Sequence, residues 1–521
     1  MLKKIGIGIV LAVLVIGIAG YLYIDRALLR DPFTPLFADS CASCHGDDMA
    51  GTGSGPSLLE GDFPSARGVR DLERQISGHP PVQGLPERVA SLTDEEVRGL
   101  SILIGETATN RTYRTFEIEE PLGIPEGVVE SELHNFRLEV VTDALHALPF
   151  SLAPLPDGGV LVTEKMKGLR YVSASGEVSE LIEGTPEVFD DGFDVLGLPF
   201  GVGWLLDVAL HPDFASNGWI YLHYTERCTD CDSIEDRSRN TVVRGRIESG
   251  RWVDQELIWQ PGREFYSNVP DIGAGGRLAF DDAGHLFISV GIKGRMNYDG
   301  MQNLSTPIGK IHRVNLDGSI PLDNPFVTTP GAMQSVWTYG HRSPQGLEFN
   351  HRTGELWETE MGPRGGDEVN VLVPGRNYGW PLTSRGIDYD GTHVEYGREL
   401  NLEFDPADIE QPRIDLTPGP AVSSFAFCEG GQFAAWQGHL IVGTLAAREL
   451  YRIDPSEGGR VETLLRDVGR IRDVELGADG AVYLLIEHPT GGRILRMIEV
   501  RAENTDEHDS KILASRSHGA G

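Results

Sequence analysis

The chain has 521 residues, 40% of them hydrophobic, which is long enough for two or three domains and too apolar for global disorder. Its 45 basic and 78 acidic residues give a formal charge of −33, and such a surface repels phosphate backbones. The composition therefore argues against a nucleic-acid partner, and the 64 glycines and 31 prolines favour turns over long helices.

The first 26 residues form an apolar segment with charges at both ends. Lys3 and Lys4 precede residues 5–24, which carry no charge, and Asp25 and Arg26 follow them. A run of this length can span a bilayer as a helix, and the two lysines favour a cytoplasmic N-terminus. A cleaved signal peptide is the alternative, but its apolar region is usually about 7–15 residues long. We therefore predict an uncleaved transmembrane anchor over 1–26 in a bacterial-type inner membrane, with the bulk of the chain in the periplasm.

Residues 31–108 contain a motif for covalent haem attachment, Cys41-Ala42-Ser43-Cys44-His45. Two thiols three positions apart on one helical turn can bond the two vinyl groups of one haem. The histidine that follows can then bind the iron as its proximal ligand. A redox or structural Cys-x-x-Cys followed by a chance histidine is the alternative.

Two further helices are expected in this stretch. Val69, Leu72 and Ile76 recur on one helical face, and Thr93 with Glu96 forms a capping box before a second apolar run. Together with the haem motif, residues 31–108 resemble a class I cytochrome c, which predicts a small all-α domain that binds haem c.

The residue at the position of the sixth iron ligand differs from that family, which normally has a methionine followed by a proline there. Here Leu85 precedes Pro86, and leucine cannot ligate iron. His79 is the nearest substitute, while an iron that is open or binds water, and ligation by Met49, are the alternatives.

One strand pattern returns six times in residues 136–500. An apolar strand, a turn and a glycine are followed by a strand rich in β-branched and aromatic residues. The glycines that lead these second strands are Gly159, Gly218, Gly284, Gly354, Gly438 and Gly480. The repeats are long enough for four strands each and predict an all-β six-bladed β-propeller. A two-sheet sandwich also alternates short strands, but it does not explain six returns of one hairpin.

Two segments flank the predicted propeller. Residues 109–135 are rich in glutamate and proline and are predicted to be a linker, whereas residues 501–521 are polar, lack periodicity and are predicted to be a disordered tail.

Seven segments of the propeller region resemble one family. They are 205–214, 275–278 (GGRL), 315–325, 340–346 (GHRSPQG), 360–368, 377–381 (NYGWP) and 470–474 (RIRDV). In this order they resemble the soluble quinoprotein aldose dehydrogenases, the glucose/sorbosone dehydrogenase family. The resemblance implies pyrroloquinoline quinone and a calcium ion at one mouth of the propeller, and oxidation of a sugar or another alcohol.

The resemblance also implies roles for matching residues. The backbone carbonyls of Gly362 and Pro363 would ligate calcium, and Asp367 would support the ion through water. Arg342 matches the arginine that polarises the quinone carbonyl. The arginines that pair with the cofactor's carboxylates fall on Arg470 and Arg472.

Several family positions carry different residues here. Gly273 stands where the family has its catalytic histidine, and Ala446 where it has a cofactor-binding lysine. Ser343, Val202 and Leu416 replace an asparagine, a glutamine and an aromatic residue. Glycine cannot accept a proton, so the base that hydride transfer requires is missing from its usual place.

Asp271 is the titratable residue nearest to that place, although an aspartate beside glycine and proline is commonly a turn residue. Two functions therefore stay open. The first is a membrane-anchored dehydrogenase that sends electrons from the quinone to the fused haem and on to a downstream acceptor. The second is a propeller that has lost the quinone and binds a ligand or partner beside a cytochrome.

The three remaining cysteines have structural interpretations. Cys228 and Cys231 lie in a loop of an exported body, which predicts a local disulfide, with a metal site as the alternative. Cys428 lies in an apolar strand and is predicted to be a buried free thiol.

Overall fold

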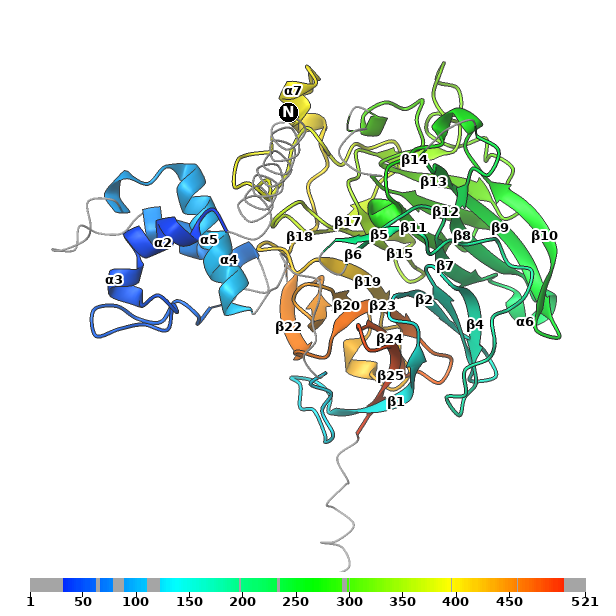
Figure 1. The fold of residues 1–521 in the computed structure, drawn as a ribbon, viewed down its shortest axis with the longest axis horizontal. Coiled ribbons are helices and arrows are strands. Elements are labelled where there is room, and N and C mark those ends of the chain that lie inside the picture. The colour runs from blue at the N-terminus through cyan, green and yellow to red at the C-terminus, as the bar shows by residue number, and fades with distance from the viewer. Residues whose placement is uncertain are drawn as a thin grey trace, which may run out of the picture.

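The computed structural model describes residues 31–61, 66–77, 89–109, 122–195, 198–231, 235–292, 298, 300–394, 396–456 and 458–500, which form a helical unit and a larger β-propeller (Figure 1). The predicted anchor, the proposed sixth ligand His79 and the predicted tail 501–521 lie outside these residues. No helix within the described ranges has the length and apolar character needed to cross a membrane.

The helical unit contains α2 (Thr34–Ser40), α3 (Ala42–His45), α4 (Ala66–Ser77), a 3₁₀ turn (Val89–Ser91) and α5 (Asp94–Ala108). Both helices expected after the haem motif are present. The capping box that begins α5 has formed, because Thr93 accepts from the backbone of Glu96 and Glu96 accepts from the backbone of Thr93. Val69 and Leu100 are fully buried in the core between α4 and α5.

The propeller consists of six antiparallel sheets in the part of the chain that the structure describes, and a short hairpin of β5 (Phe193–Val195) and β6 (Leu198–Phe200). The first blade has β2 (Pro149–Pro154), β3 (Val160–Glu164) and β4 (Gly168–Val172). The second has β7 (Leu205–Leu210), β8 (Ile220–Arg227), β9 (Ser238–Glu248) and β10 (Arg251–Trp259). The third has β11 (Gly275–Phe280), β12 (His285–Val290), β13 (Lys310–Asn315) and β14 (Val336–Tyr339).

The remaining blades complete the ring. The fourth has β15 (Pro344–Asn350), β16 (Glu355–Glu360), β17 (Glu368–Leu372) and β18 (Ile414–Asp415). The fifth has β19 (Val422–Phe427), β20 (Leu440–Thr444), β21 (Leu450–Asp454) and β22 (Arg460–Leu465). The sixth has β23 (Arg470–Leu476), β24 (Val482–Glu487) and β25 (Gly492–Glu499), with β1 (Phe136–Leu145) as its outer strand.

The ring closes through strands from both ends of the propeller sequence. β1 pairs with β25, from Phe136 opposite Glu499 to Leu145 opposite Gly492. The innermost strands β2, β7, β11, β15, β19 and β23 contact one another in that order, and β23 returns to β2. This arrangement gives a central channel and confirms the predicted six-bladed propeller.

The six repeated glycines mark the second strand of every blade, as predicted. They precede or begin the segments that form β3, β8, β12, β16, β20 and β24. Gly284 (φ +87°) and Gly480 (φ +74°) have left-handed backbone conformations, which a tight hairpin needs and other residues rarely adopt. The repeat is therefore visible in the sequence because each blade uses the same turn chemistry.

The second half of the predicted linker lies along the propeller. The amide of Gly123 donates to Asp467, and Glu132 forms an ion pair with Arg452 at 2.8 Å. Leu122 and Ile124 pack on the core of the fifth and sixth blades. Apolar residues among the glutamates explain why this segment is bound rather than extended into solvent.

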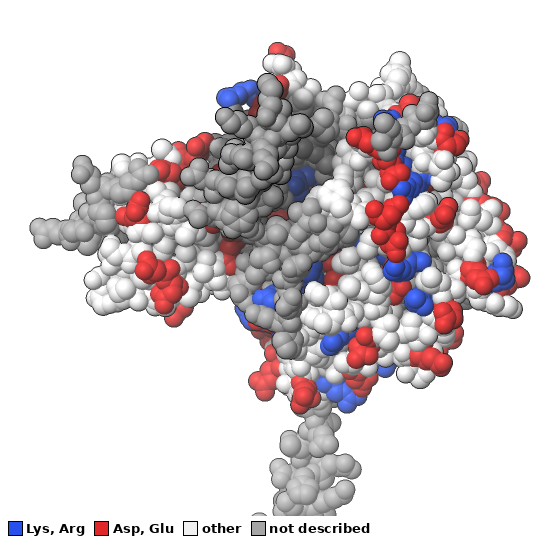
Figure 2. Space-filling model, viewed as in Figure 1, with Lys and Arg blue, Asp and Glu red and all other residues white. Residues whose placement is uncertain are grey.

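The charged surface and the cysteines agree with what the sequence predicts. Figure 2 shows Asp and Glu side chains over both parts of the molecule on the face drawn, interspersed with Lys and Arg on the propeller. Cys228 and Cys231 form the predicted disulfide. Cys428 is a buried free thiol, as predicted, and burial raises its pKa to about 12.

Candidate active site at the propeller mouth

The residues singled out in the sequence gather at one mouth of the channel. Arg342 lies two residues before β15, and Arg470 and Arg472 are the first and third residues of β23. Gly273 lies just before β11 and faces Ile292, which follows β12. The amide of Ile292 donates to the carbonyl of Arg342 at 2.8 Å. Residues from three blades thus meet where their inner strands start.

A buried cluster of charges, which we call the mouth cluster, consists of Lys165, Arg470, Arg472 and Glu487. Lys165 Nζ and Arg472 Nε both lie 2.8 Å from Oε1 of Glu487. Arg470 Nε lies 3.1 Å from the other oxygen, Oε2. Because three cations surround a single carboxylate, Glu487 cannot balance them all, and the cluster is suited to an additional anion.

The pKa values in the mouth cluster reflect this imbalance. Burial by itself raises the pKa of Glu487, but Arg472, Lys165 and Arg470 outweigh burial and hold that pKa well below its usual value. Burial, reinforced by repulsion from Arg472, lowers the pKa of Lys165 to about 8. The sequence analysis did not single out Lys165. Its position could have indicated a role, because a lysine directly after the fully buried strand β3 is unusual.

Phe150 separates the mouth cluster from the middle of the channel. Its ring centre lies 5.6 Å from Lys165 Nζ and 5.7 Å from Arg472 Cζ on one side, and 4.6 Å from Arg277 Cζ. Rings at these distances attract cations through their negative faces. Phe150 itself is buried.

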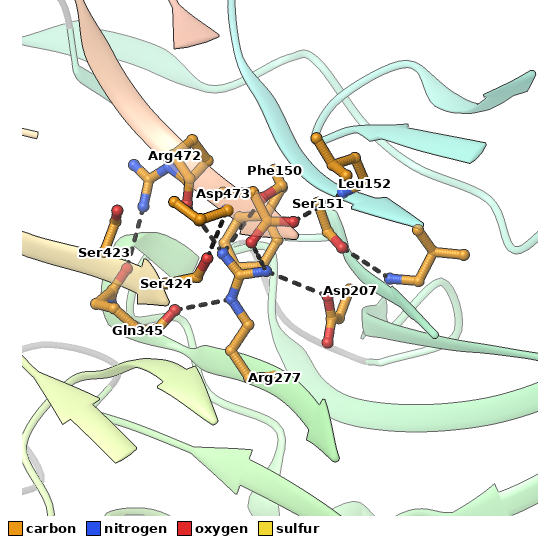
Figure 3. Close-up of polar contacts among 12 residues, drawn as sticks. Phe150, Ser151, Leu152, Asp207, Arg277, Gln345, Ser423, Ser424, Arg472 and Asp473 are labelled. Atoms are coloured by element: carbon orange, nitrogen blue, oxygen red, sulfur yellow. Dashed lines mark hydrogen bonds and ion pairs between the residues drawn. The ribbon is translucent and has the colours of Figure 1, made fainter. Parts of the chain in front are cut away.

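Arg277, the arginine of the GGRL segment, closes the middle of the channel (Figure 3). Its Nη1 lies 2.8 Å from Asp473 and 3.3 Å from Asp207, and its Nε donates to the carbonyl of Gln345 at 2.8 Å. It also donates to the carbonyl of Arg472 at 3.1 Å. We call Arg277, Asp207 and Asp473 the channel plug. Beyond it, a cavity of about 330 Å³ is lined by Asp207 and other inner-strand residues.

Arg342 is held by backbone groups. Its Nη1 donates to the carbonyls of Met361 at 2.9 Å and Gly362 at 2.8 Å, and its guanidinium lies 5.2 Å from the ring centre of Trp380. Its amide donates to Glu360 at 2.7 Å. Burial, together with the nearby Glu358, raises the pKa of Glu360 to about 8. Arg342 thus presents a fixed positive charge at the mouth.

The proposed calcium loop is tightly folded around Asp367. One carboxylate oxygen of Asp367 accepts from the amide of Gly362 at 3.1 Å, and the other from the amide of Val422 at 2.7 Å. Carbonyl and carboxylate oxygens are the donor types that calcium prefers. The Gly362 carbonyl already accepts from Arg342, so an ion at Gly362 would share that oxygen with the guanidinium.

The substituted family positions are closed and mostly apolar. Val202, Leu416 and Ala446 are buried, and Ser343 accepts from the side chain of Gln345 at 2.9 Å. A Cβ added at Gly273 would lie 2.6 Å from the carbonyl oxygen of Ile292. Position 273 therefore has no room for a side chain in this backbone arrangement.

Asp271 is tied to the fold. Its Oδ2 accepts from the amide of Gly203 at 2.7 Å and from Thr225 at 2.5 Å, and its Oδ1 accepts from Ser238 at 2.7 Å. A carboxylate so engaged holds loops together, which argues against the role of base that the sequence suggested for it.

The haem motif lies on α3, on the side of the helical unit away from the propeller in Figure 1. Burial, together with Cys44, raises the pKa of the Cys41 thiol to about 11. Nδ1 of His45 lies 2.8 Å from the carbonyl of Pro56, so Nδ1 is engaged and Nε2 is the ring nitrogen left to bind a metal. Met49 is buried in the core of the helical unit.

Residues 146–496, which make up most of the propeller, match the family model described as Glucose / Sorbosone dehydrogenase. The aldose sugar dehydrogenase of Escherichia coli (strain K12) is 35% identical over 365 residues, which covers 68% of this chain and 91% of that protein. Quinoprotein glucose dehydrogenase B of Acinetobacter calcoaceticus is 29% identical over 332 residues, covering 59% of this chain and 65% of that protein.

Solved structures give the same result. The soluble aldose sugar dehydrogenase of Escherichia coli in its apo form is 33% identical with a TM-score of 0.58, covering 70% of this chain and 99% of that one. The PQQ-bound aldose sugar dehydrogenase of Streptomyces coelicolor is 25% identical with a TM-score of 0.51, covering 70% and 98%. On the extent of these matches, this chain belongs to the glucose/sorbosone dehydrogenase family.

Proposed function

We propose that this protein is a membrane-anchored oxidoreductase that oxidises a sugar or another alcohol at the propeller mouth and delivers the electrons through a covalently attached haem c to a downstream acceptor. The observation that carries the proposal is the buried mouth cluster, in which Lys165 and Arg472 share one oxygen of Glu487. A polycarboxylate such as pyrroloquinoline quinone would balance the remaining positive charge. A relative with bound PQQ supports this choice of anion.

When bound, pyrroloquinoline quinone supplies a two-electron oxidant for the alcohol. Lys165, Arg470 and Arg472 would hold its carboxylates, and Arg342, fixed by two backbone carbonyls, would direct positive charge at a quinone oxygen. Phe150 would exclude water from below.

Calcium is proposed as the accompanying ion. The carbonyls of Gly362 and Pro363 would be its ligands, and Asp367 would hold the loop that presents them, as its contact with the Gly362 amide suggests.

The proton of the alcohol needs an acceptor other than residue 273. Asp271 is engaged by three donors, and Gly273 has no space for a side chain without movement of Ile292. General-base catalysis contributes about 100- to 10,000-fold in rate. We therefore expect common aldoses to be oxidised poorly, and substrates with an acidic hydroxyl to react best.

Haem c is proposed at Cys41, Cys44 and His45, with Nε2 of His45 on the iron, because Nδ1 is engaged by Pro56. His79 is the proposed sixth ligand. The uncharged segment 5–24 and the Cys228–Cys231 disulfide support a chain anchored in a bacterial-type inner membrane with its bulk in the oxidising periplasm.

The second candidate function is a propeller that has lost the quinone and binds a ligand or partner beside the cytochrome. The apolar burial of Val202, Leu416 and Ala446, where the family has polar or aromatic residues, favours it. A cation cluster that recognises another anion would fit this alternative.

Reduction of the haem separates the two functions. The full chain, produced in a host that attaches c-type haem, is mixed with pyrroloquinoline quinone, calcium and a panel of alcohols while the haem absorbance is followed. We expect reduction that requires both quinone and alcohol and that needs about tenfold to a hundredfold more quinone in Arg472→Gln. Absence of quinone binding, with no haem reduction by any alcohol, would support the second function.

Haem attachment is tested on a denaturing gel. Cys41→Ala combined with Cys44→Ala should leave no haem on the polypeptide, because both thioether bonds are removed. Covalent haem that persists in the double variant would refute the assignment.

A further inference from the structure

The helical unit is joined to the rim of the mouth through one arginine. Arg364 follows the two carbonyls proposed for calcium, and its side chain is fully buried. Its Nη2 lies 2.8 Å from Oε2 of Glu106, and its Nε lies 3.2 Å from Oε1. Nη2 also contacts the carboxylate of Asp31. Glu106 belongs to the last turn of α5 and Asp31 precedes α2, so a guanidinium of the propeller is enclosed by acids of the helical unit.

An apolar contact surrounds this ion cluster. Phe33 lies between Gly99 on α5 and Gly391 on a loop of the fourth blade. A Cβ at Gly99 would lie 1.9 Å from the Phe33 ring, and a Cβ at Gly391 would lie 3.0 Å from it. Ile387, from the same propeller loop, is buried in the core of the helical unit. The two parts therefore share a packed interior.

Two loops of the fourth blade are tied together beneath the helical unit. The amide of Arg364 donates to the carbonyl of Ile387 at 3.1 Å, and the amide of Ile387 donates to the carbonyl of Arg364 at 2.8 Å. Arg98 on α5 donates to the carbonyl of Arg385. The loops 362–366 and 385–391 are thus both bonded to the helical unit, through α5 and through Asp31 before α2.

We propose that Arg364 is a positioning residue and that the docked helical unit is part of the mouth, because the acids of the helical unit fix the conformation of loop 362–366. Loss of one partner from a buried ion cluster is costly, so neutralising Glu106 should loosen the loop on the other side of the interface. By linkage, whatever binds the loop must in turn stabilise docking. The identity of that ligand rests on the proposed function, whereas the coupling does not.

The coupling is tested by hydrogen exchange on the full chain. Glu106→Gln changes a residue of the helical unit only, yet we expect peptides covering 362–367 and 385–391 to exchange at least about tenfold faster, because the Arg364–Ile387 amide pair opens more often. Glu410→Gln is the matched control, since Glu410 pairs with the half-exposed Arg376 on the same blade. The control should leave these peptides within about twofold of the wild type.

Unchanged exchange in loop 362–367 in both Glu106→Gln and Arg364→Gln would overturn the proposal, because the loop would then keep its shape without the helical unit. If Glu106→Gln does not fold, Asp31→Asn serves as the second variant and the same loop is measured.

Calcium alone, titrated calorimetrically, separates the coupling from the proposed function. If the wild type binds calcium, Glu106→Gln should bind it about tenfold more weakly, and equal affinity would count against coupling. If the wild type binds no calcium, the proposed ion site fails, and the exchange result decides the coupling by itself.

Discussion

The channel plug and the mouth cluster are both buried groups of ions, but their net charges are opposite in sign. The plug has one cation and two carboxylates, whereas the mouth cluster has three cations and one carboxylate. In the plug, Arg277 forms ion pairs with both Asp207 and Asp473. Asp207 also accepts a hydrogen bond from the amide of Leu278 at 2.7 Å, and Asp473 accepts one from the amide of Leu152 at 2.8 Å. In the mouth cluster Lys165 and Arg472 share one oxygen of Glu487.

This difference separates structure from function. The hydrogen bonds of the plug connect inner strands of several blades and complete a structural unit. The mouth cluster has more positive charge than its carboxylate balances, which is unfavourable for a stable core and suitable for a bound anion. We therefore expect substitutions in the plug to affect stability and substitutions in the mouth cluster to affect anion binding.

The largest effect is expected in the plug. Arg277→Met should lower the free energy of unfolding by about 3–5 kcal/mol, because Asp207 and Asp473 would remain buried without their cation. Denaturant titration measures this change. Arg251→Met is the control, since Arg251 pairs with Glu183 in solvent and should contribute less than about 1 kcal/mol. Equal losses in the two variants would mean that the plug has no special structural role.

The next effect is expected at Gly273. Gly273→Ala should lower the free energy of unfolding by about 1–3 kcal/mol, because its Cβ would meet the Ile292 carbonyl at 2.6 Å. Gly127→Ala is the control, since a Cβ there meets nothing within 4 Å. For the same reason Gly273→His combined with Ala446→Lys should raise activity on aldoses only if the loop containing Ile292 moves. A stable Gly273→Ala protein would show that the loop does move.

In the mouth cluster the expected change is in affinity. Arg472→Gln should weaken binding of pyrroloquinoline quinone by about tenfold to a hundredfold, through loss of one charge-assisted contact. The free energy of unfolding should change little, because Lys165 and Arg470 still accompany Glu487. Fluorescence titration gives the affinity and denaturant titration the stability. A large loss of stability with unchanged affinity would make the mouth cluster a second plug.

The smallest effect is the pH dependence due to Lys165. The pKa of this lysine is about 8 in the folded protein against an ordinary value of 10.5, so the folded state releases the proton first. Its contribution to stability is therefore present above pH 10.5 and is lost as the pH falls through about 8. Between these values wild-type stability should rise with pH, whereas anion affinity should fall by about tenfold or less. Neither trend should appear in Lys165→Met, and an identical pH profile in that variant would assign the titration to another group.

Local patterns in the sequence determined the elements of the fold. The capping box of Thr93 and Glu96, the hairpin glycines such as Gly284 and the Cys228–Cys231 disulfide each depend on residues within a few positions of one another. Six repeats of one hairpin were enough to predict the propeller, because each blade buries the same pattern of apolar strands. The seven family segments likewise located the mouth, through Arg342, Arg470 and Arg472.

The tertiary structure alone decided which charges meet. Lys165 and Glu487 are 322 positions apart, and Arg364 and Glu106 are 258 apart, so no local pattern links them. The sequence also offered Asp271 as a base, and only the fold shows that Gly203, Thr225 and Ser238 engage its carboxylate. Short-range spacing specifies turns and helix ends, whereas the energy of a buried charge depends on every group that the closed ring brings within a few ångströms of it.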